Sequence, residues 1–319
     1  MSHNIRIGDA LNESFQFGLR RWFTVFRLGW LPLLASGMAA LGLQYLIFDM
    51  AALEAAVEAG ANFNLAEVMR VSSFLAFGLM LIVFVFMIAV VSGLLASIYR
   101  LVALGEEREG YVDLRFDGPA QRVFWAQLIV TLINVSVILV FVVIAIPMTG
   151  SSFGEVFKSL GAFSLLMQSA MADPNVGQPD QATLEALYAP LGSVFLGVFV
   201  ALLPLAYINI RLSPFSPGSA AENRLLFFGS LELTKGRFFS LLGLFFLFTL
   251  ALLLVGIIYS LVTGIFEMMA TIGGPNILAV IAMLSKFILF GLMVVYNIFI
   301  IGVQASLHAI IYRQLSTGE

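Results

Sequence analysis

The chain has 319 residues, of which 61% are hydrophobic and 11% are charged, and it carries a formal net charge of −3. Soluble domains contain roughly 45–50% apolar and about 25% charged residues, so this composition excludes an ordinary soluble globule and requires lipid as solvent for part of the surface. The small net charge argues against a nucleic-acid partner, and the absence of cysteine excludes disulfides, thiolate metal sites and cysteine nucleophiles.

Six apolar stretches are long enough to cross a bilayer. A transmembrane helix needs about 20 predominantly apolar residues, and open strands are excluded because lipid cannot pair their backbone groups. The predicted spans cover residues 24–48, 72–99, 124–148, 191–211, 239–265 and 287–311. We therefore expect an all-α polytopic membrane protein with six transmembrane helices.

The spans fall into three two-helix hairpins that share their flanking residues. Each hairpin opens on an arginine followed by aromatic residues and closes on a second arginine. The opening arginines are Arg21, Arg122 and Arg237, and the closing arginines are Arg100, Arg211 and Arg313. We expect one integral membrane domain over residues 1–319, built from three related units at about 9–101, 117–212 and 219–315.

Amphipathic segments precede two of the hairpins. Residues 9–21 predict a helix with Asp9 as its N-cap. Residues 219–235 predict a second helix that starts in a capping box of Ser219 and Glu222. Such helices are typical of membrane interfaces, where the apolar face meets the acyl chains. Before the middle hairpin, Asp117-Gly118-Pro119 predicts the cap of a helix that continues into the third span.

The placement of positive charge predicts the orientation. All lysines and arginines except Arg70, Lys158 and Lys286 lie at the N-terminus, at the C-terminus, or in the loops that join one hairpin to the next. Positively charged loops stay in the cytoplasm. We therefore expect a multi-pass protein of the bacterial inner membrane with both termini cytoplasmic.

A cytoplasmic ring of basic and aromatic side chains is the first candidate site. It consists of Arg20, Arg21, Trp22, Arg27, Arg100, Arg122, Trp125, Arg211, Lys235, Arg237 and Arg313. Arginine and tryptophan collect at membrane interfaces for topological reasons alone. The sharper interpretation is docking of anionic lipid headgroups, since guanidinium suits bidentate phosphate binding and basic residues attract anionic lipid.

A second candidate group is made of polar residues within the spans. It contains Asn134, Asn297, Gln304 and His308. Hydrogen bonds between helices are the commoner explanation for such residues, and contact with a transported substrate is the other.

Enzymatic constellations are missing from this sequence. With only His3 and His308, and no carboxylate pair within the spans, a metal site is not expected. Ser92, Ser97 and Ser306, the serines considered as partners of His308, do not lie in a Gly-x-Ser-x-Gly context, and the sequence contains no Gly-x-x-x-x-Gly-Lys-Ser/Thr motif. We expect no enzyme activity and no cofactor.

Two segments resemble a known family. Residues 230–239, Ser-Leu-Glu-Leu-Thr-Lys-Gly-Arg-Phe-Phe, precede a span, and the chain opens with Ile7-Gly8-Asp9-Ala10-Leu11 followed by Phe15 and Trp22. These segments resemble the bacterial six-pass proteins related to the membrane domain of glycerophosphoryl diester phosphodiesterases, whose pattern reads roughly Ser-Trp-x-Leu-Thr-x-Gly-x-Phe-Trp. Leu231 stands where that pattern has Trp.

The resemblance implies a stand-alone membrane module concerned with lipid or envelope metabolism. The family's phosphodiesterase activity belongs to a separate barrel domain, which this sequence does not contain, so that activity is not implied. We expect a non-enzymatic module that associates with anionic lipid or a protein partner through its cytoplasmic basic face. The alternative is a permease-like protein for a small or lipid-like molecule, with a cavity near the midplane lined by Asn134, Asn297 and Gln304.

Overall fold

A computed structural model describes residues 5–47, 73–107, 116–156, 158–159, 181–271 and 278–317. Every regular element in these ranges is an α-helix. Six helices in these ranges include a stretch that is long and apolar enough to span a membrane. They are α2 (Trp22–Ile47), α5 (Ser73–Leu104), α6 (Gly118–Met148), α8 (Gln181–Arg211), α11 (Phe238–Thr271) and α12 (Leu278–Thr317). The described residues confirm the prediction of an all-α fold with six helices that are long and apolar enough to span a membrane.

Several of these helices continue beyond the apolar stretches that predicted them. The longest, α12, has 40 residues, and at about 1.5 Å per residue it exceeds a hydrocarbon core of about 30 Å. Hydropathy marks only the part of a helix immersed in lipid, so it underestimates the helix length. Residues 48 and 72, which bound the predicted first and second spans, lie outside the described residues.

The contacts divide the chain into two compact units. Unit 1 contains Met1–Leu34, Ala89–Gln127 and Asn209–Glu319, and unit 2 contains Ala35–Ile88 and Leu128–Ile208. The first four spanning helices each contribute to both units, whereas α11 and α12 belong to unit 1. All the arginines that open and close the hairpins fall in unit 1.

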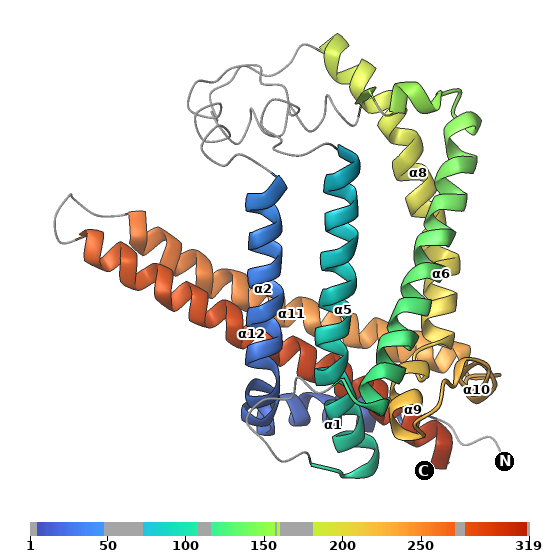
Figure 1. Ribbon diagram of the computed structural model, residues 1–319, viewed down its shortest axis with the longest axis vertical. Coiled ribbons are helices and arrows are strands. Elements are labelled where there is room, and N and C mark those ends of the chain that lie inside the picture. The colour runs from blue at the N-terminus through green and yellow to red at the C-terminus, as the bar shows by residue number, and fades with distance from the viewer. Residues whose placement is uncertain are drawn as a thin grey trace. The chain divides into compact units, whose positions relative to one another are not determined.

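In unit 1, helix α1 (Ile7–Arg20) packs along α12 through a face of small residues. Ala10, Ser14 and Gly18, each four residues apart, are buried, and a Cβ added at Gly18 would lie 2.4 Å from Cγ2 of Val303. The Ser306 hydroxyl donates to the Ser14 carbonyl at 3.4 Å. Figure 1 shows α1 beside α12, with α11 running along α12. Small side chains therefore allow the two backbones to approach closely.

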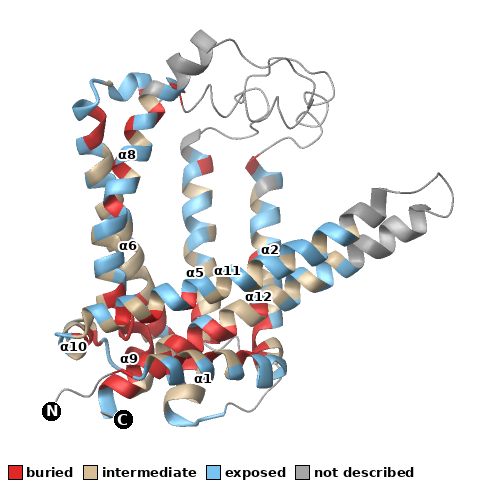
Figure 2. Cartoon of the chain, turned by 180° about the vertical axis from the view of Figure 1, so that it is seen from behind, coloured by how far each residue is buried: buried red, intermediate tan, exposed pale blue. Residues whose placement is uncertain are grey.

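Two buried apolar clusters hold unit 1 together. One joins α2, α5, α6, α9 and α12 and includes Val25, Leu94, Ile98, Val123, Ala220 and Ile298. The other joins α1, α11 and α12 and includes Ala10, Leu241, Leu244, Val303, Leu307 and Ile310. Figure 2 shows buried residues gathered along α9 and the C-terminal part of α12. The C-terminal helix thus contributes to both clusters.

The segment between α8 and α11 differs from the prediction. Instead of one helix over 219–235, it forms α9 (Phe215–Ala221) and α10 (Phe227–Leu233), and Asn223 adopts a φ of 50° between them. The prediction of a capping box at Ser219 was wrong. Ser219 lies near the end of α9, and its hydroxyl accepts a hydrogen bond from the Leu226 N–H at 3.1 Å. Asparagine tolerates the left-handed region better than most residues, so it breaks the helix there.

The two other predicted helix starts had different outcomes. The prediction of Asp9 as N-cap was wrong, because α1 begins at Ile7 and Asp9 lies in its first turn, where a carboxylate still favours the helix dipole. The cap before α6 is confirmed, since the Ala120 N–H donates to Asp117 Oδ1 at 3.2 Å and the helix continues into the third span.

Unit 2 contains the close approach of α6 and α8. A Cβ added at Gly197 would lie 2.7 Å from the Cα of Val142, so only glycine allows this contact. After α6, the Ser152 N–H donates to Glu155 Oε2 at 2.8 Å, and the Glu155 N–H donates to the Ser152 hydroxyl at 3.2 Å. This reciprocal pair is a capping box, and it starts the short helical turn that follows.

Candidate functional site: a basic cleft between α1, α5 and α12

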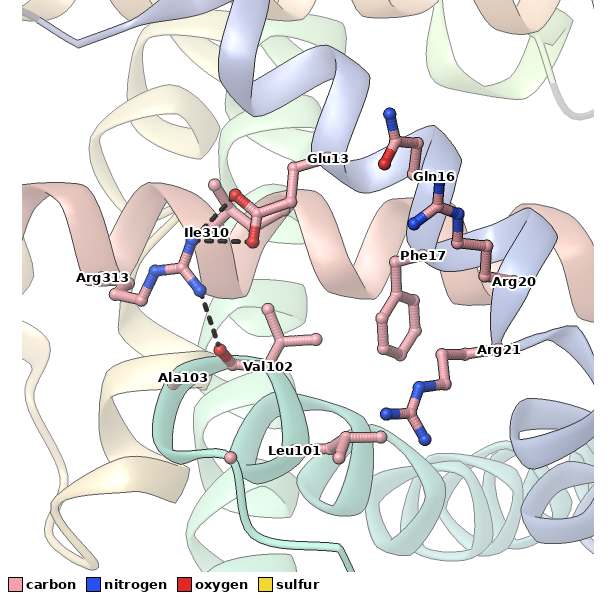
Figure 3. Close-up of a pocket in the computed structure, with 11 residues that line it drawn as sticks. Glu13, Gln16, Phe17, Arg20, Arg21, Leu101, Val102, Ala103, Ile310 and Arg313 are labelled. Carbon is pink, nitrogen blue, oxygen red and sulfur yellow. Dashed lines mark hydrogen bonds and ion pairs between the residues drawn. The ribbon is translucent and has the colours of Figure 1, made fainter.

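A cleft of about 450 Å³ opens in unit 1 where α1 meets the ends of α5 and α12. Residues at spacings of three, four and seven share one face of a helix, and α1 accordingly turns Glu13, Gln16, Phe17 and Arg20 toward the cleft. The remaining lining residues are Arg21, Leu101, Val102, Ala103, Gly105, Ile310 and Arg313. Figure 3 shows the Glu13 carboxylate and the Arg313 guanidinium on one side of the cleft, and Arg20 and Arg21 on the other.

Glu13 and Arg313 form an ion pair on one side of the cleft. Arg313 Nη2 donates to both carboxylate oxygens of Glu13 at 2.7 Å, and Arg313 Nη1 donates to the Val102 carbonyl at 3.3 Å. Among the described residues that line the cleft, Glu13 is the one carboxylate, and these bonds neutralise it. They also hold α1, α5 and α12 in a fixed arrangement around it.

The second side carries unneutralised positive charge. Among the described residues, Arg20 has no hydrogen-bond or ionic partner, and it is exposed. Arg21 lies 3.6 Å from Glu107, which also lies 4.0 Å from Arg27. Among the described residues, Glu107 thus lies near two guanidinium groups, and Arg20 adds a further positive charge beside Arg21.

The three arginines that close the hairpins share a structural role. Each donates to a main-chain carbonyl in the last turn of another helix, or at its C-cap. Arg100 bonds Ala220 of α9 at 3.0 Å, Arg211 bonds Leu231 of α10 at 2.6 Å and the C-cap Thr234 at 3.3 Å, and Arg313 bonds Val102 of α5 at 3.3 Å. The last carbonyls of a helix lack partners within it and lie at the negative end of its dipole, so guanidinium groups are suited to these positions.

The other members of the predicted basic and aromatic ring do not gather at the cleft. Trp22 and Trp125 are exposed, and so is Lys235, while Arg27, Arg122 and Arg237 are partly buried. Arg122 Nε is buried without a hydrogen-bond partner among the described residues. Of the eleven residues predicted for the ring, the structure brings Arg20, Arg21 and Arg313 together in one cleft.

The predicted intramembrane polar residues line neither the cleft nor the groove that the structure shows in unit 1. Asn297 is exposed, and its amide donates to the Met293 carbonyl of its own helix at 2.8 Å. Gln304 is exposed, His308 lies partly buried with its ring 5.6 Å from that of Phe245, and Asn134 is partly buried in unit 2. A groove along α11 and α12 is lined instead by Thr249, Leu252, Leu253, Gly256, Ile257, Tyr259, Ser260, Leu261 and Tyr296.

Sequence reasoning missed the polar partners of the cleft. Glu13 and Gln16 belonged to the polar face of the predicted first helix, and their spacing with Arg20 is the signal that places all three on one side. Glu107 carried no such signal, because it lies in a loop and its contacts with Arg21 and Arg27 depend on tertiary structure.

No protein-family model, curated protein or solved structure matches this chain. Within the described part of the chain, no group of three or more histidine or acidic residues is arranged to hold a metal ion. The side chains that line the cleft supply guanidinium donors on one side, and a carboxylate and an amide nearby.

Proposed function

We propose that this chain is a non-enzymatic module of the bacterial inner membrane that associates with anionic lipid through the cleft. The observation that carries the proposal is the Arg20 guanidinium, which lacks a partner among the described residues and lies beside Arg21, where the first span begins. Arginine binds phosphate oxygens in bidentate geometry. A lipid fits this position better than a protein partner does, because the residues that start a span lie at headgroup depth.

Apolar side chains next to the cleft support lipid as the ligand. Leu19 is 65% exposed and Trp22 is 45% exposed, and both flank the two arginines in sequence. Tryptophan is enriched at the headgroup level of membranes. A phospholipid whose phosphate is bound by Arg20 and Arg21 would have its acyl chains next to Leu19 and Trp22.

The orientation belongs to the same proposal. The distribution of positive charge supports cytoplasmic termini, and α1 and α10 would then lie as amphipathic helices at the cytoplasmic interface. The most exposed apolar residue of α10 is Phe228, at 76%. Reporter fusions at Gly177 and at the C-terminus test this topology, and activity of a cytoplasmic reporter at Gly177 would overturn it.

We also propose that the three hairpins are repeats. Ser14 and Ser230 occupy equivalent places before the first and third hairpins. Both are fully buried, and each hydroxyl donates to the carbonyl three residues earlier at 2.8 Å. The shared role of the closing arginines Arg100, Arg211 and Arg313 supports the same conclusion.

The proposed relationship to the six-pass family rests on residues 230–239. Within this segment Ser230 and Thr234 are fully buried, and the Thr234 hydroxyl lies within hydrogen-bond distance of the Ser230 carbonyl at 2.8 Å and of the Arg211 carbonyl at 3.2 Å. A motif with such a structural role can be shared by proteins that differ in function. It supports a common architecture, whereas the role in lipid or envelope metabolism is proposed from the family resemblance alone.

Lipid retention tests the proposed function directly. The protein would be incorporated in nanodiscs that contain equal amounts of phosphatidylcholine and an anionic phospholipid, extracted in mild detergent, and examined by native mass spectrometry. We expect anionic lipid to be retained preferentially, and the double variant R20Q/R21Q to lose this preference. R6Q is the matched control, because Arg6 is exposed next to the same helix but does not line the cleft. Equal retention of both lipids by the unmodified protein would refute the proposal.

A permease-like role is the second candidate. The groove along α11 and α12 has a volume of about 810 Å³, and the rings of Tyr259 and Tyr296 stack there with centroids 4.2 Å apart. Two phenols, one from α11 and one from α12, are suited to hold a lipid-like molecule. Substrate-dependent uptake into proteoliposomes that disappears in the Y259F/Y296F variant would favour this function over lipid association.

A further inference from the structure

The cleft contains hydrogen-bond acceptors as well as cations. An ionised carboxylate has about four acceptor positions, and Arg313 Nη2 approaches each oxygen of Glu13 once. The Gln16 amide nitrogen donates to Asn12 Oδ1 at 3.0 Å, so the Gln16 carbonyl oxygen is the atom left for a ligand. Glu13 and Gln16 lie on the same face of α1 as Arg20, at distances of seven and four residues along the helix.

The cations and the hydrogen-bond acceptors of the cleft together suit a ligand that carries both an anionic group and hydroxyl donors. Arg20 and Arg21 suit a phosphate, and Glu13 with Gln16 suits hydroxyl donors a few ångströms away. A volume of about 450 Å³ falls within the range of small-molecule pockets and corresponds to about 15 water molecules at roughly 30 Å³ each. This space is larger than a bare phosphate requires.

We infer that the cleft selects, among anionic lipids, a phosphodiester whose headgroup is a polyol, as in phosphatidylglycerol. The phosphate binds between Arg20 and Arg21, and the glycerol hydroxyls donate to Gln16 Oε1 and to the Glu13 carboxylate. The exposed Leu19 and Trp22 place the acyl chains beside the site, so the ligand is the lipid rather than free glycerol phosphate. This inference rests on the proposed function and specifies its ligand.

Another anionic lipid provides a comparison at constant charge. Phosphatidylethanol has the same phosphodiester and the same single negative charge but no headgroup hydroxyl, so it cannot donate to Gln16 or Glu13. The cleft should therefore favour phosphatidylglycerol over phosphatidylethanol.

The test is competition between these lipids in nanodiscs of fixed anionic content, read by native mass spectrometry of the full chain. We expect phosphatidylglycerol to be retained at least about 3- to 10-fold more than phosphatidylethanol, which is the ratio for the Gln16 hydrogen bond alone. Q16L should lower the ratio by that factor, because the Glu13 acceptor remains, without lowering the retention of phosphatidylethanol. R20Q should lower the retention of both lipids. D9N is the control, because Asp9 is exposed on the same helix and does not line the cleft, and it should leave the ratio unchanged.

The possible failures are distinguishable. Equal retention of phosphatidylglycerol and phosphatidylethanol, both above phosphatidylcholine, would overturn the headgroup inference and leave the proposed lipid function intact. Retention of no anionic lipid above phosphatidylcholine would overturn both. Displacement of bound phosphatidylglycerol by soluble glycerol phosphate at equal concentration would show that the acyl chains add nothing, and it would overturn the lipid as the ligand.

Discussion

Glu13 and Arg313 are 300 residues apart in the sequence and form a paired contact in which Arg313 Nη2 lies 2.7 Å from each oxygen of the Glu13 carboxylate. The same guanidinium donates to the Val102 carbonyl at 3.3 Å. One side chain therefore joins the first helix of the chain, the end of α5 and the last helix. The cleft exists because these three helices meet at this point.

The Glu13–Arg313 pair should stabilise the docking of α1 measurably but modestly. Both side chains are partly exposed, at 44% and 32%, so solvent screening limits the pair to about 1 kcal/mol or less. We expect E13Q to cost that amount and R313Q to cost about 1–2 kcal/mol, since R313Q also leaves the Val102 carbonyl without its donor. Reversible unfolding in detergent would give both values.

A double-mutant cycle isolates the coupling between the two side chains. E13Q/R313Q should be less destabilised than the sum of the single variants, because each single change already removes the shared contact. E232Q is a suitable control for the loss of an exposed carboxylate. Strict additivity of E13Q and R313Q would mean that the pair contributes no stability.

The contact of Gly18 with α12 predicts opposite effects of alanine at two positions of one helix. A Cβ at Gly18 would lie 2.4 Å from Cγ2 of Val303, whereas nothing lies within 4 Å of a Cβ at Gly8. Valine is restricted at χ1, so G18A should destabilise the protein by about 1–3 kcal/mol through overpacking. G8A should raise stability by up to about 1 kcal/mol through helix propensity.

A compensating change tests the cause of the G18A effect. V303A removes the methyl group that a Cβ at position 18 would meet, so G18A/V303A should recover part of the loss. Because the chain has no cysteine, a single cysteine at Gln16 could report the docking of α1 by its labelling rate in each variant. If G18A/V303A is no more stable than either single variant, the destabilisation by G18A has a cause other than the contact with Val303.

The Thr234 hydroxyl should be necessary for the end of α10. It is fully buried and lies within hydrogen-bond distance of the Arg211 and Ser230 carbonyls. Because the Thr234 N–H also donates to Ser230, T234V removes a donor chiefly from the Arg211 carbonyl, at a cost of about 1–3 kcal/mol. T249V is the matched control, because the Thr249 hydroxyl bonds only the Phe245 carbonyl of its own helix at 2.8 Å and is exposed. Hydrogen exchange over residues 227–236 should accelerate in T234V and stay unchanged in T249V.

The sequence predicted the spanning helices because lipid imposes a simple requirement on them: a long apolar run with all backbone groups paired within the helix. It also predicted the cap at Asp117, where the determinants are neighbours in sequence. It failed at Ser219, where a serine followed three residues later by glutamate has the pattern of a capping box but lies at the end of a helix. Its hydroxyl bonds the Leu226 N–H instead, and local patterning does not encode that choice.

The site was predicted in its residue types but not in its grouping. Arginines near membrane interfaces are visible in the sequence, yet Arg100 and Arg211 bond helix ends while Arg20 faces a cleft. That difference depends on which helix terminus lies within reach, which is decided by tertiary contacts. The Glu13–Arg313 pair was likewise out of reach, because no periodicity connects residues 300 positions apart.

The capping box after α6 predicts a pH dependence at Glu155. The Ser152 N–H and hydroxyl hydrogen bonds, with a smaller contribution from Lys158, lower the pKa of the Glu155 carboxyl below its ordinary value. Since the folded-state pKa is lowered, the box stabilises the helix start at pH values above the ordinary pKa, and this stabilisation is lost as the pH falls through the lowered value.

Carbon-13 NMR of the Glu155 carboxyl in micelles, assigned by the missing signal of E155Q, measures this shift. We expect the pKa of the Glu155 carboxyl to be lower than that of the same glutamate in an unstructured peptide. S152P removes the N–H donor and should raise the pKa toward the peptide value. S152A keeps that N–H and should raise it less. A Glu155 pKa at or above the peptide value would mean that the carboxylate does not accept the Ser152 N–H in solution, because that bond favours the charged form.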